Sequence, residues 1–140
     1  MKLSKALSLL FVGLAMGGFA QTKIEAQDGI HYITTNIDYP ITGTYLFKGT
    51  EPVVELNASG NGFYQRHEQP KKAISWGIEC DEAGKPIFKK GFDNAAYTLW
   101  YLYTNPESED EKYWKVTSFT IHFNSLKMFI QGERSKSYTE

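Results

Sequence analysis

Three histidines, one cysteine and an acidic run are the residues of this chain whose types could support chemistry. His31, His67 and His122 lie on three different segments, and no pair of them has the H-x-H or H-x-x-x-H spacing typical of a metal site. His67 and His122 could meet only if the fold made their strands neighbours. We therefore expect histidines at the surface or rim, hydrogen-bonded to water, and no bound metal.

Cys80 continues the apolar side of a predicted strand that also carries Ile74, Trp76 and Ile78. A catalytic thiolate needs a histidine or a positive environment beside it, and the spacing offers neither, so we expect a buried, unreactive thiol. The acidic run lacks the D-x-[DN]-x-[DN]-G pattern of a calcium loop and is predicted to be solvated; it comprises Glu107, Glu109, Asp110 and Glu111. The sequence also lacks the G-x-S-x-G, P-loop and G-x-G-x-x-G motifs. We expect no catalytic residues, no cofactor and no enzymatic activity.

Aromatic side chains are more distinctive, since the sequence holds 3 Trp, 9 Tyr and 9 Phe. In an extended strand, segment 97–103 places its tyrosines and Leu99 on one face and Trp100 and Leu102 on the other. We expect Trp100 and Leu102 to join the packed layer. The tyrosine face would then line a pocket or its mouth, where rings and hydroxyls suit an apolar or amphipathic ligand. The predicted ligand-binding residues are Tyr97, Leu99, Tyr101, Tyr103, Tyr45 and Trp76. An aromatic-rich core with its hydroxyls at the surface is the alternative.

The first twenty residues have the organisation of a secretory signal peptide. Lys2 and Lys5 precede the apolar segment 7–16, and Gly18 and Ala20 are the small residues expected before a cleavage site. We expect cleavage after Ala20 and a secreted or periplasmic protein without a membrane span. Without Lys2 and Lys5, 13 of the 15 basic residues remain against 16 acidic ones, a net charge of −3. This mild charge does not indicate a nucleic-acid partner.

The elements that must position these residues are short strands separated by Gly-, Pro- and Asn-containing turns. The clearest is 73–80, where apolar and small or polar residues alternate. Further strands are predicted at 43–47, 53–56, 63–67, 86–89, 97–104, 113–123 and 126–131. About eight such strands favour an all-β, antiparallel meander that closes into a small barrel, and a β-sandwich is the alternative. The expected organisation is a signal peptide (1–20), a polar leader with a possible first strand (21–39), one barrel domain (40–134) and a tail (135–140).

A resemblance to a known family rests on Gly43-Thr44-Tyr45, which opens a strand, and on Arg134 just beyond the last strand. This pattern resembles small bacterial lipocalin-like (calycin) domains, where a Gly-x-Trp on the first strand is crossed by a late arginine; Tyr45 takes the place of the tryptophan. The resemblance implies a closed barrel with a ligand cavity and no catalysis. We therefore expect a secreted or periplasmic barrel that binds a small apolar or amphipathic ligand. A protein-binding barrel that acts as an inhibitor or immunity-type protein is the alternative.

Overall fold

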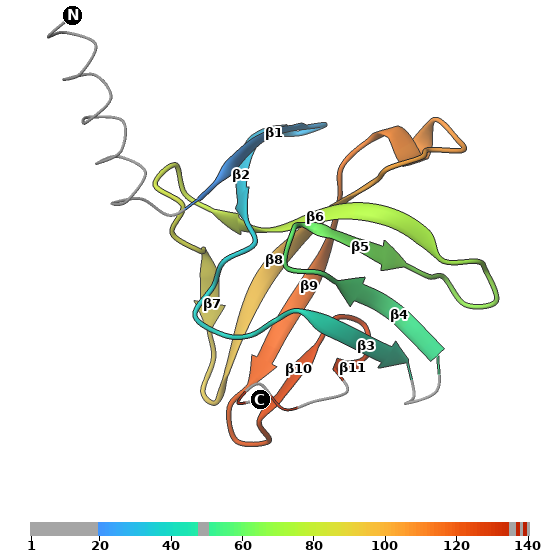
Figure 1. Cartoon of the computed structure of the whole chain (residues 1–140). Coiled ribbons are helices and arrows are strands. Elements are labelled where there is room, and N and C mark those ends of the chain that lie inside the picture. Colours follow the sequence, from blue (N-terminus) through green and yellow to red (C-terminus); the bar gives the residue numbers. More distant parts are fainter. Residues whose placement is uncertain (1–19, 48–50, 135–136, 138, 140) are drawn as a thin grey trace, which may run out of the picture.

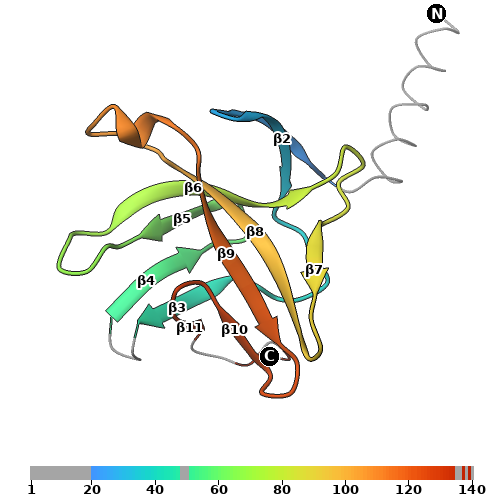
Figure 2. The same cartoon turned by 180° about the vertical axis from the view of Figure 1, so that it is seen from behind.

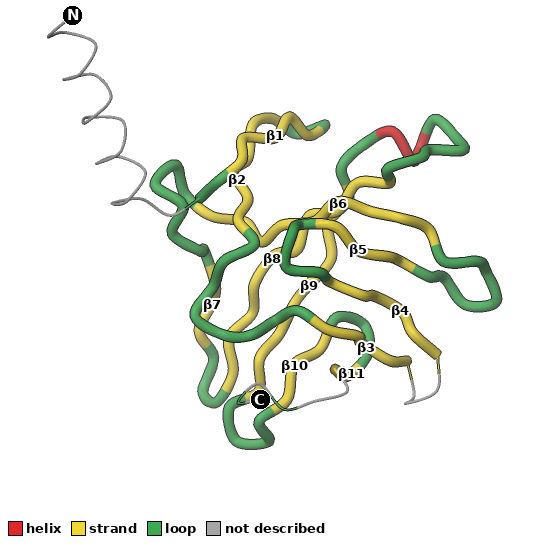
Figure 3. The backbone as a smooth tube through the Cα atoms, viewed as in Figure 1, coloured by secondary structure: helices red, strands yellow, loops and turns green. Residues whose placement is uncertain are grey.

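The computed structural model describes residues 20–47, 51–134, 137 and 139; the predicted signal peptide before Ala20 lies outside them. Nearly all regular structure in this part of the chain is β-strand, and the only helical element is a short 3-10 turn, η1 (Asp110–Lys112) (Figure 3). The strands are β1 (Thr22–Ala26), β2 (Gly29–Thr34), β3 (Gly43–Phe47), β4 (Glu51–Leu56), β5 (Asn61–Tyr64), β6 (Lys72–Cys80), β7 (Phe88–Lys90), β8 (Asn94–Tyr103), β9 (Lys115–His122), β10 (Lys127–Phe129) and β11 (Glu133–Arg134).

Eight of these strands form a closed antiparallel barrel, which confirms the predicted fold (Figures 1 and 2). The order around the barrel is β3-β4-β5-β6-β8-β9-β10-β11, and β11 returns to pair with β3. Every strand except β6 and β11 is followed around the barrel by the next strand of the chain, because short turns connect antiparallel neighbours most easily. Closure leaves the barrel strands without an exposed edge, which a sheet of this size otherwise presents to other chains.

The three remaining strands lie outside the closed ring. β7 pairs with the first half of β8, and the β1–β2 hairpin pairs with the second half of β6. In the predicted leader (21–39), the first extended segment is expected at 30–35, which β2 matches, and 21–28 is expected to be a loose polar segment; the latter expectation is wrong because this segment contains β1. Its single large apolar residue, Ile24, is buried with Ile33 and Trp100 between the hairpin and the barrel wall. One buried isoleucine among polar residues gave too little periodicity for the sequence to predict the strand.

The inward-facing side chains of β6 and β8 form much of the barrel interior, and they follow the alternation predicted for these strands. Along β8, the tyrosines and Leu99 point inward, as expected, and they are buried in the core, as in the alternative of an aromatic-rich core. Trp100 points outward and is covered by the hairpin, whereas Leu102 is only half-buried and belongs to neither core cluster, so its predicted place in the packed layer is wrong. On β6, the indole of Trp76 is buried and donates from Nε1 to the carbonyls of Asn57 and Asn61, at 3.1 and 3.0 Å. The aromatic face therefore forms the core of the fold.

One end of the barrel is covered by the chain between β2 and β3. The Tyr45 hydroxyl, fully buried, donates to the Ile41 carbonyl at 2.7 Å, and the Arg134 guanidinium donates to the carbonyls of Pro40 and Thr42 (2.9 Å to Thr42). Gly43 has φ +135°, and the place where its Cβ would stand lies 3.4 Å from Arg134 Cδ. The glycine and the late arginine of the lipocalin-like pattern are thus in contact across the β3–β11 pair. Hydrogen bonds therefore hold the segment between β2 and β3 over this end of the barrel.

Candidate ligand-binding site

A cavity of about 430 Å³ lies at the other end of the barrel, where β5 and β8 end and β6 and β9 begin. We call it the mouth cavity. Its lining residues are Tyr64, Arg66, His67, Gln69, Pro70, Lys72, Tyr103 and Glu111. The predicted strand 63–67 in fact ends at Tyr64, so that Arg66 and His67 belong to a loop that borders the cavity instead of to the barrel wall. A cavity of this volume falls within the range of small-molecule sites.

Two tyrosines line the mouth cavity, Tyr64 on β5 and Tyr103 on β8, and the buried ring of Tyr101 packs against both. The rings of Tyr64 and Tyr101 are stacked, with centroids 4.9 Å apart and an interplanar angle of 6°. Tyr103 stands edge-on to both, at 87°. The Tyr64 hydroxyl donates to Gln131 Oε1 at 3.0 Å, and Gln131 Nε2 lies 3.3 Å from Thr117 Oγ1. The rings are therefore held at fixed angles by packing and by hydrogen bonds before any ligand arrives.

Burial favours the neutral form of two of these phenols. It raises the pKa of Tyr101 well above its usual value, and the neighbouring phenols of Tyr64 and Tyr103 add to the rise. Burial also raises the pKa of Tyr103, although the nearby charge of Arg66 partly offsets it. Near neutral pH Tyr103 therefore presents a phenol and a ring face to the cavity rather than a phenolate.

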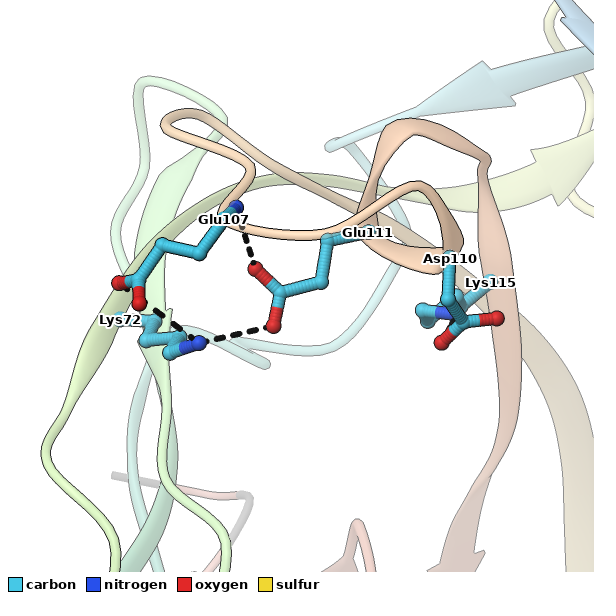
Figure 4. A network of polar contacts seen from close by, with 5 residues as sticks. All are labelled: Lys72, Glu107, Asp110, Glu111 and Lys115. Atoms are coloured by element: carbon cyan, nitrogen blue, oxygen red, sulfur yellow. Dashed lines mark hydrogen bonds and ion pairs between the residues drawn. The ribbon is translucent and has the colours of Figure 1, made fainter.

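A charged network forms one side of the mouth (Figure 4). Lys72 Nζ at the start of β6 lies 2.8 Å from Glu111 Oε2 and 3.7 Å from Glu107 Oε1. The other oxygen of Glu111 accepts a hydrogen bond from the Glu107 backbone N–H at 3.0 Å. The Lys72 ammonium and this N–H hold the pKa of Glu111 below its usual value, and the Glu111 contact raises the pKa of Lys72. Asp110 pairs with Lys115 at 2.8 Å. The prediction of a wholly solvated acidic run is wrong for Glu111, which is buried.

The predicted ligand-binding residues separate into several places. Tyr103 lines the mouth cavity, and Tyr97 lines a smaller pocket of about 210 Å³ beside β7, together with Tyr39 and Phe88. Trp76 borders a cleft on the outer wall. The other three, Leu99, Tyr101 and Tyr45, are buried in the core and line none of these three spaces. The sequence did not predict a ligand-binding role for four residues that line the mouth cavity: Tyr64, Arg66, Lys72 and Glu111. Only Tyr64 could have been found, because the alternation along 63–64 indicates that it points into the barrel.

Of the histidines and the cysteine, only His67 lines the mouth cavity, whereas Glu111 of the acidic run lines it as well. His31 lies between Asp28 Oδ1 at 2.8 Å and Glu79 Oε2 at 3.1 Å, with its ring 4.5 Å from that of Trp100. It is a half-buried part of the hairpin contact, so the expected surface histidine bound to water is wrong here. Burial by itself lowers the pKa of His31, but the hydrogen bonds to Glu79 and Asp28 outweigh it and raise the pKa above its usual value.

His122 packs edge-on against Phe129 on β10, while His67 lies in the exposed loop after β5. In the described ranges, no three side chains of His, Cys, Asp or Glu are grouped as a metal site would require. Cys80 is buried, as predicted, and burial, followed by the charges of Asp81 and Glu79, raises its pKa to about 11. A thiol of such high pKa is a poor nucleophile near neutral pH.

Comparison with known proteins gives no match among protein-family models, curated proteins or solved structures. Within the residues that the structure describes, no helix has both the length and the apolar character needed to cross a membrane.

Proposed function

We propose that this protein is a secreted or periplasmic, non-enzymatic β-barrel that binds a small amphipathic ligand at its mouth. The observation that carries the proposal is the mouth cavity itself, where the rings of Tyr64 and Tyr103 meet the charged side chains of Arg66 and Lys72. The contact between Gly43 and Arg134 supports the lipocalin-like resemblance on which the expectation of a ligand cavity rests.

The charges at the rim favour a ligand with an anionic group. Lys72 is paired with Glu111 and Glu107. Arg66 is exposed, and it is engaged more weakly, by a side-chain hydrogen bond to Tyr103 and by the nearby charges of Asp110 and Glu111. A guanidinium at a rim attracts a carboxylate or sulfonate and can hold it with two hydrogen bonds. The tyrosine rings below would then contact the apolar part of the ligand. A fatty acid or an aromatic acid has this combination of groups.

The test is a titration with anilinonaphthalene sulfonate, an apolar anionic dye, followed by dye fluorescence and by tyrosine and tryptophan emission. Arg66→Glu should weaken binding about tenfold or more, because it replaces an attractive rim charge with a repulsive one. Lys23→Glu on β1, an exposed charge reversal away from the mouth, is the matched control and should leave the affinity unchanged.

Tyr103→Ala should also weaken dye binding, because it removes a ring that lines the cavity. Tyr101→Ala should weaken it indirectly, by removing the ring against which Tyr64 stacks. Tyr32→Ala, a half-buried tyrosine on β2, controls for loss of any tyrosine. A wild-type protein that does not bind the dye, or a Tyr101→Ala variant that binds it unchanged, would overturn the proposal.

A protein-binding barrel is the second candidate, and exposed apolar side chains favour it. Ile87 and Phe88 are about half exposed, and Phe92, in the turn between β7 and β8, is fully exposed. The core side chains also pack across the barrel interior, which leaves the described cavities at its ends and outer wall. Exposed apolar groups of this size gathered on one edge are typical of contact surfaces. A wild-type protein that binds a partner chain but no dye at the mouth, and a Phe92→Ser variant that loses the partner chain, would favour this candidate over the first.

A further inference from the structure

A second cleft of about 410 Å³ lies on the outer wall of the barrel, beside the β1–β2 hairpin and the turn between β4 and β5. We call it the hairpin cleft. No charged side chain is among the described residues that line it. The lining includes Ala20 and Thr22, so after the expected cleavage the α-amino group of Gln21 would lie beside the cleft. Its polar lining consists of hydroxyls and one amide, from Thr22, Thr34, Thr35, Ser59, Ser75 and Asn61, and its apolar lining includes Ile33 and Trp114. This composition differs sharply from that of the mouth cavity, which Arg66, Lys72 and Glu111 line.

The fold places these groups by strand register and by one close approach. Asn61 and Ser75 are direct partners across the β5–β6 pair, so their side chains lie next to each other on the outer face. Gly60 has φ +87°, and the position that a Cβ would occupy there lies 3.5 Å from Thr35 Cγ2. The β4–β5 turn therefore approaches the end of the hairpin closely. Trp114 packs against the hairpin cluster of Ile24, Ile33 and Trp100. The cleft is therefore held between two rigid parts of the sheet.

Several polar groups in the cleft are available to a ligand. The hydroxyls of Thr22, Thr35 and Ser75 make no side-chain hydrogen bond within the described part of the chain. Asn61 Nδ2 lies 3.2 Å from Ser59 Oγ, which leaves the amide oxygen as an acceptor. Hydroxyls both donate and accept, so these groups can match a partner that presents alternating donors and acceptors.

We propose that the hairpin cleft binds a neutral saccharide. A pyranose ring offers hydroxyls at its rim and an apolar C–H face, and the cleft offers hydroxyls, an amide and an indole in one space without charged side chains. The proposal is independent of ligand binding at the mouth.

The test is a titration of the full mature chain with cellobiose, maltose and di-N-acetylchitobiose, followed by backbone amide NMR shifts. For at least one sugar we expect the amides of Thr35, Asn61 and Ser75 to shift, with a Kd on the order of 1 mM for a shallow open cleft. The proposal is overturned if none of the neutral sugars moves these amides, or if the shifts cluster at Tyr103 instead.

Variants separate binding from folding. Asn61→Ala changes an exposed side chain and should weaken sugar binding about fivefold or more, because it removes a hydrogen-bonding group and leaves the fold intact. Trp114→Ala should abolish binding, while Trp114→Phe, which keeps a ring against the hairpin cluster, should retain part of it. Val116→Ala, an exposed position on β9, is the control. Unchanged affinity in both Asn61→Ala and Trp114→Ala would contradict the proposal.

Two further arms identify the source of the sugar and separate this site from the mouth. Retention of the protein on insoluble cellulose or chitin, lost in Asn61→Ala, would indicate a polysaccharide partner, and binding of soluble disaccharides alone would indicate a free sugar. Dye binding at the mouth should be the same in wild type and in Asn61→Ala. Loss of dye binding in that variant would mean that the two sites are not independent and would overturn the assignment.

Discussion

Replacement of Trp76 by alanine should be among the most destabilising single changes in the barrel. The side chain is only 2% exposed, and its Nε1–H is shared between the carbonyls of Asn57 and Asn61. A buried tryptophan removes roughly 200 Å² from water, which at about 25 cal/mol per Å² amounts to about 5 kcal/mol. Alanine retains a small part of this and the core relaxes partly, so we expect a loss of about 3–5 kcal/mol in the free energy of unfolding.

Equilibrium urea unfolding measures this loss directly. With a slope of about 2 kcal/mol per M, the midpoint of Trp76→Ala should fall by roughly 2 M. Ser75→Ala is the matched control on the same strand, because Ser75 faces outward and its replacement should cost under about 1 kcal/mol. Trp76→Phe should lie between the two, since it keeps a ring but removes the indole N–H; the Asn57 and Asn61 carbonyls keep the backbone donors of Gly60 and Asn57. Equal midpoints for Trp76→Ala and Ser75→Ala would refute the assignment of the strand's faces.

Three other predictions concern the leader, the hairpin and the thiol. N-terminal sequencing of exported protein should give Gln21 as the first residue, and a mature chain that retains the apolar segment 7–16 would contradict it. Because the folded pKa of His31 is raised, its protonation should stabilise the protein fully below the unfolded value of 6.5, and this stabilisation should be lost as the pH rises through the folded pKa. A plot of stability against pH should therefore be flatter for His31→Gln, and identical slopes would refute the pairing with Asp28 and Glu79. Cys80 should react with a disulfide reagent much more slowly in the folded than in the urea-unfolded protein at about pH 8, and equal rates would show that it is accessible.

Sequence patterns were sufficient for the barrel because its strands depend on local alternation. The run from Tyr97 to Tyr103 has large side chains on both faces. The core covers the inner face along the whole run, and the hairpin covers the outer face at Trp100. The same reasoning failed for Leu102, because which outward residue is covered depends on where the hairpin docks. That docking is set by the pairing of β2 with the end of β6, a contact between segments distant in the chain.

The candidate site was less predictable because it depends on loops. The sequence identified Tyr103, but the pairing of Lys72 with Glu111 joins residues 39 positions apart, and no local pattern indicates it. The sequence predicts Arg66 within a strand at 63–67, but β5 ends at Tyr64 and Arg66 lies in the following loop. In the same way, the hairpin cleft needs a strand that the polar composition of 21–28 concealed. Side chains that alternate along one strand can be assigned from the sequence, whereas sites assembled from loops and strand ends cannot.

The central claim is that the mouth cavity holds a small amphipathic ligand. Native mass spectrometry of the protein purified from its own host, under conditions that preserve non-covalent complexes, tests this claim most directly. We expect a small-molecule adduct on the wild-type protein and on Lys23→Glu. The adduct should be absent from Arg66→Glu. A wild-type protein that carries no small molecule, or an adduct that persists in Arg66→Glu, would contradict it.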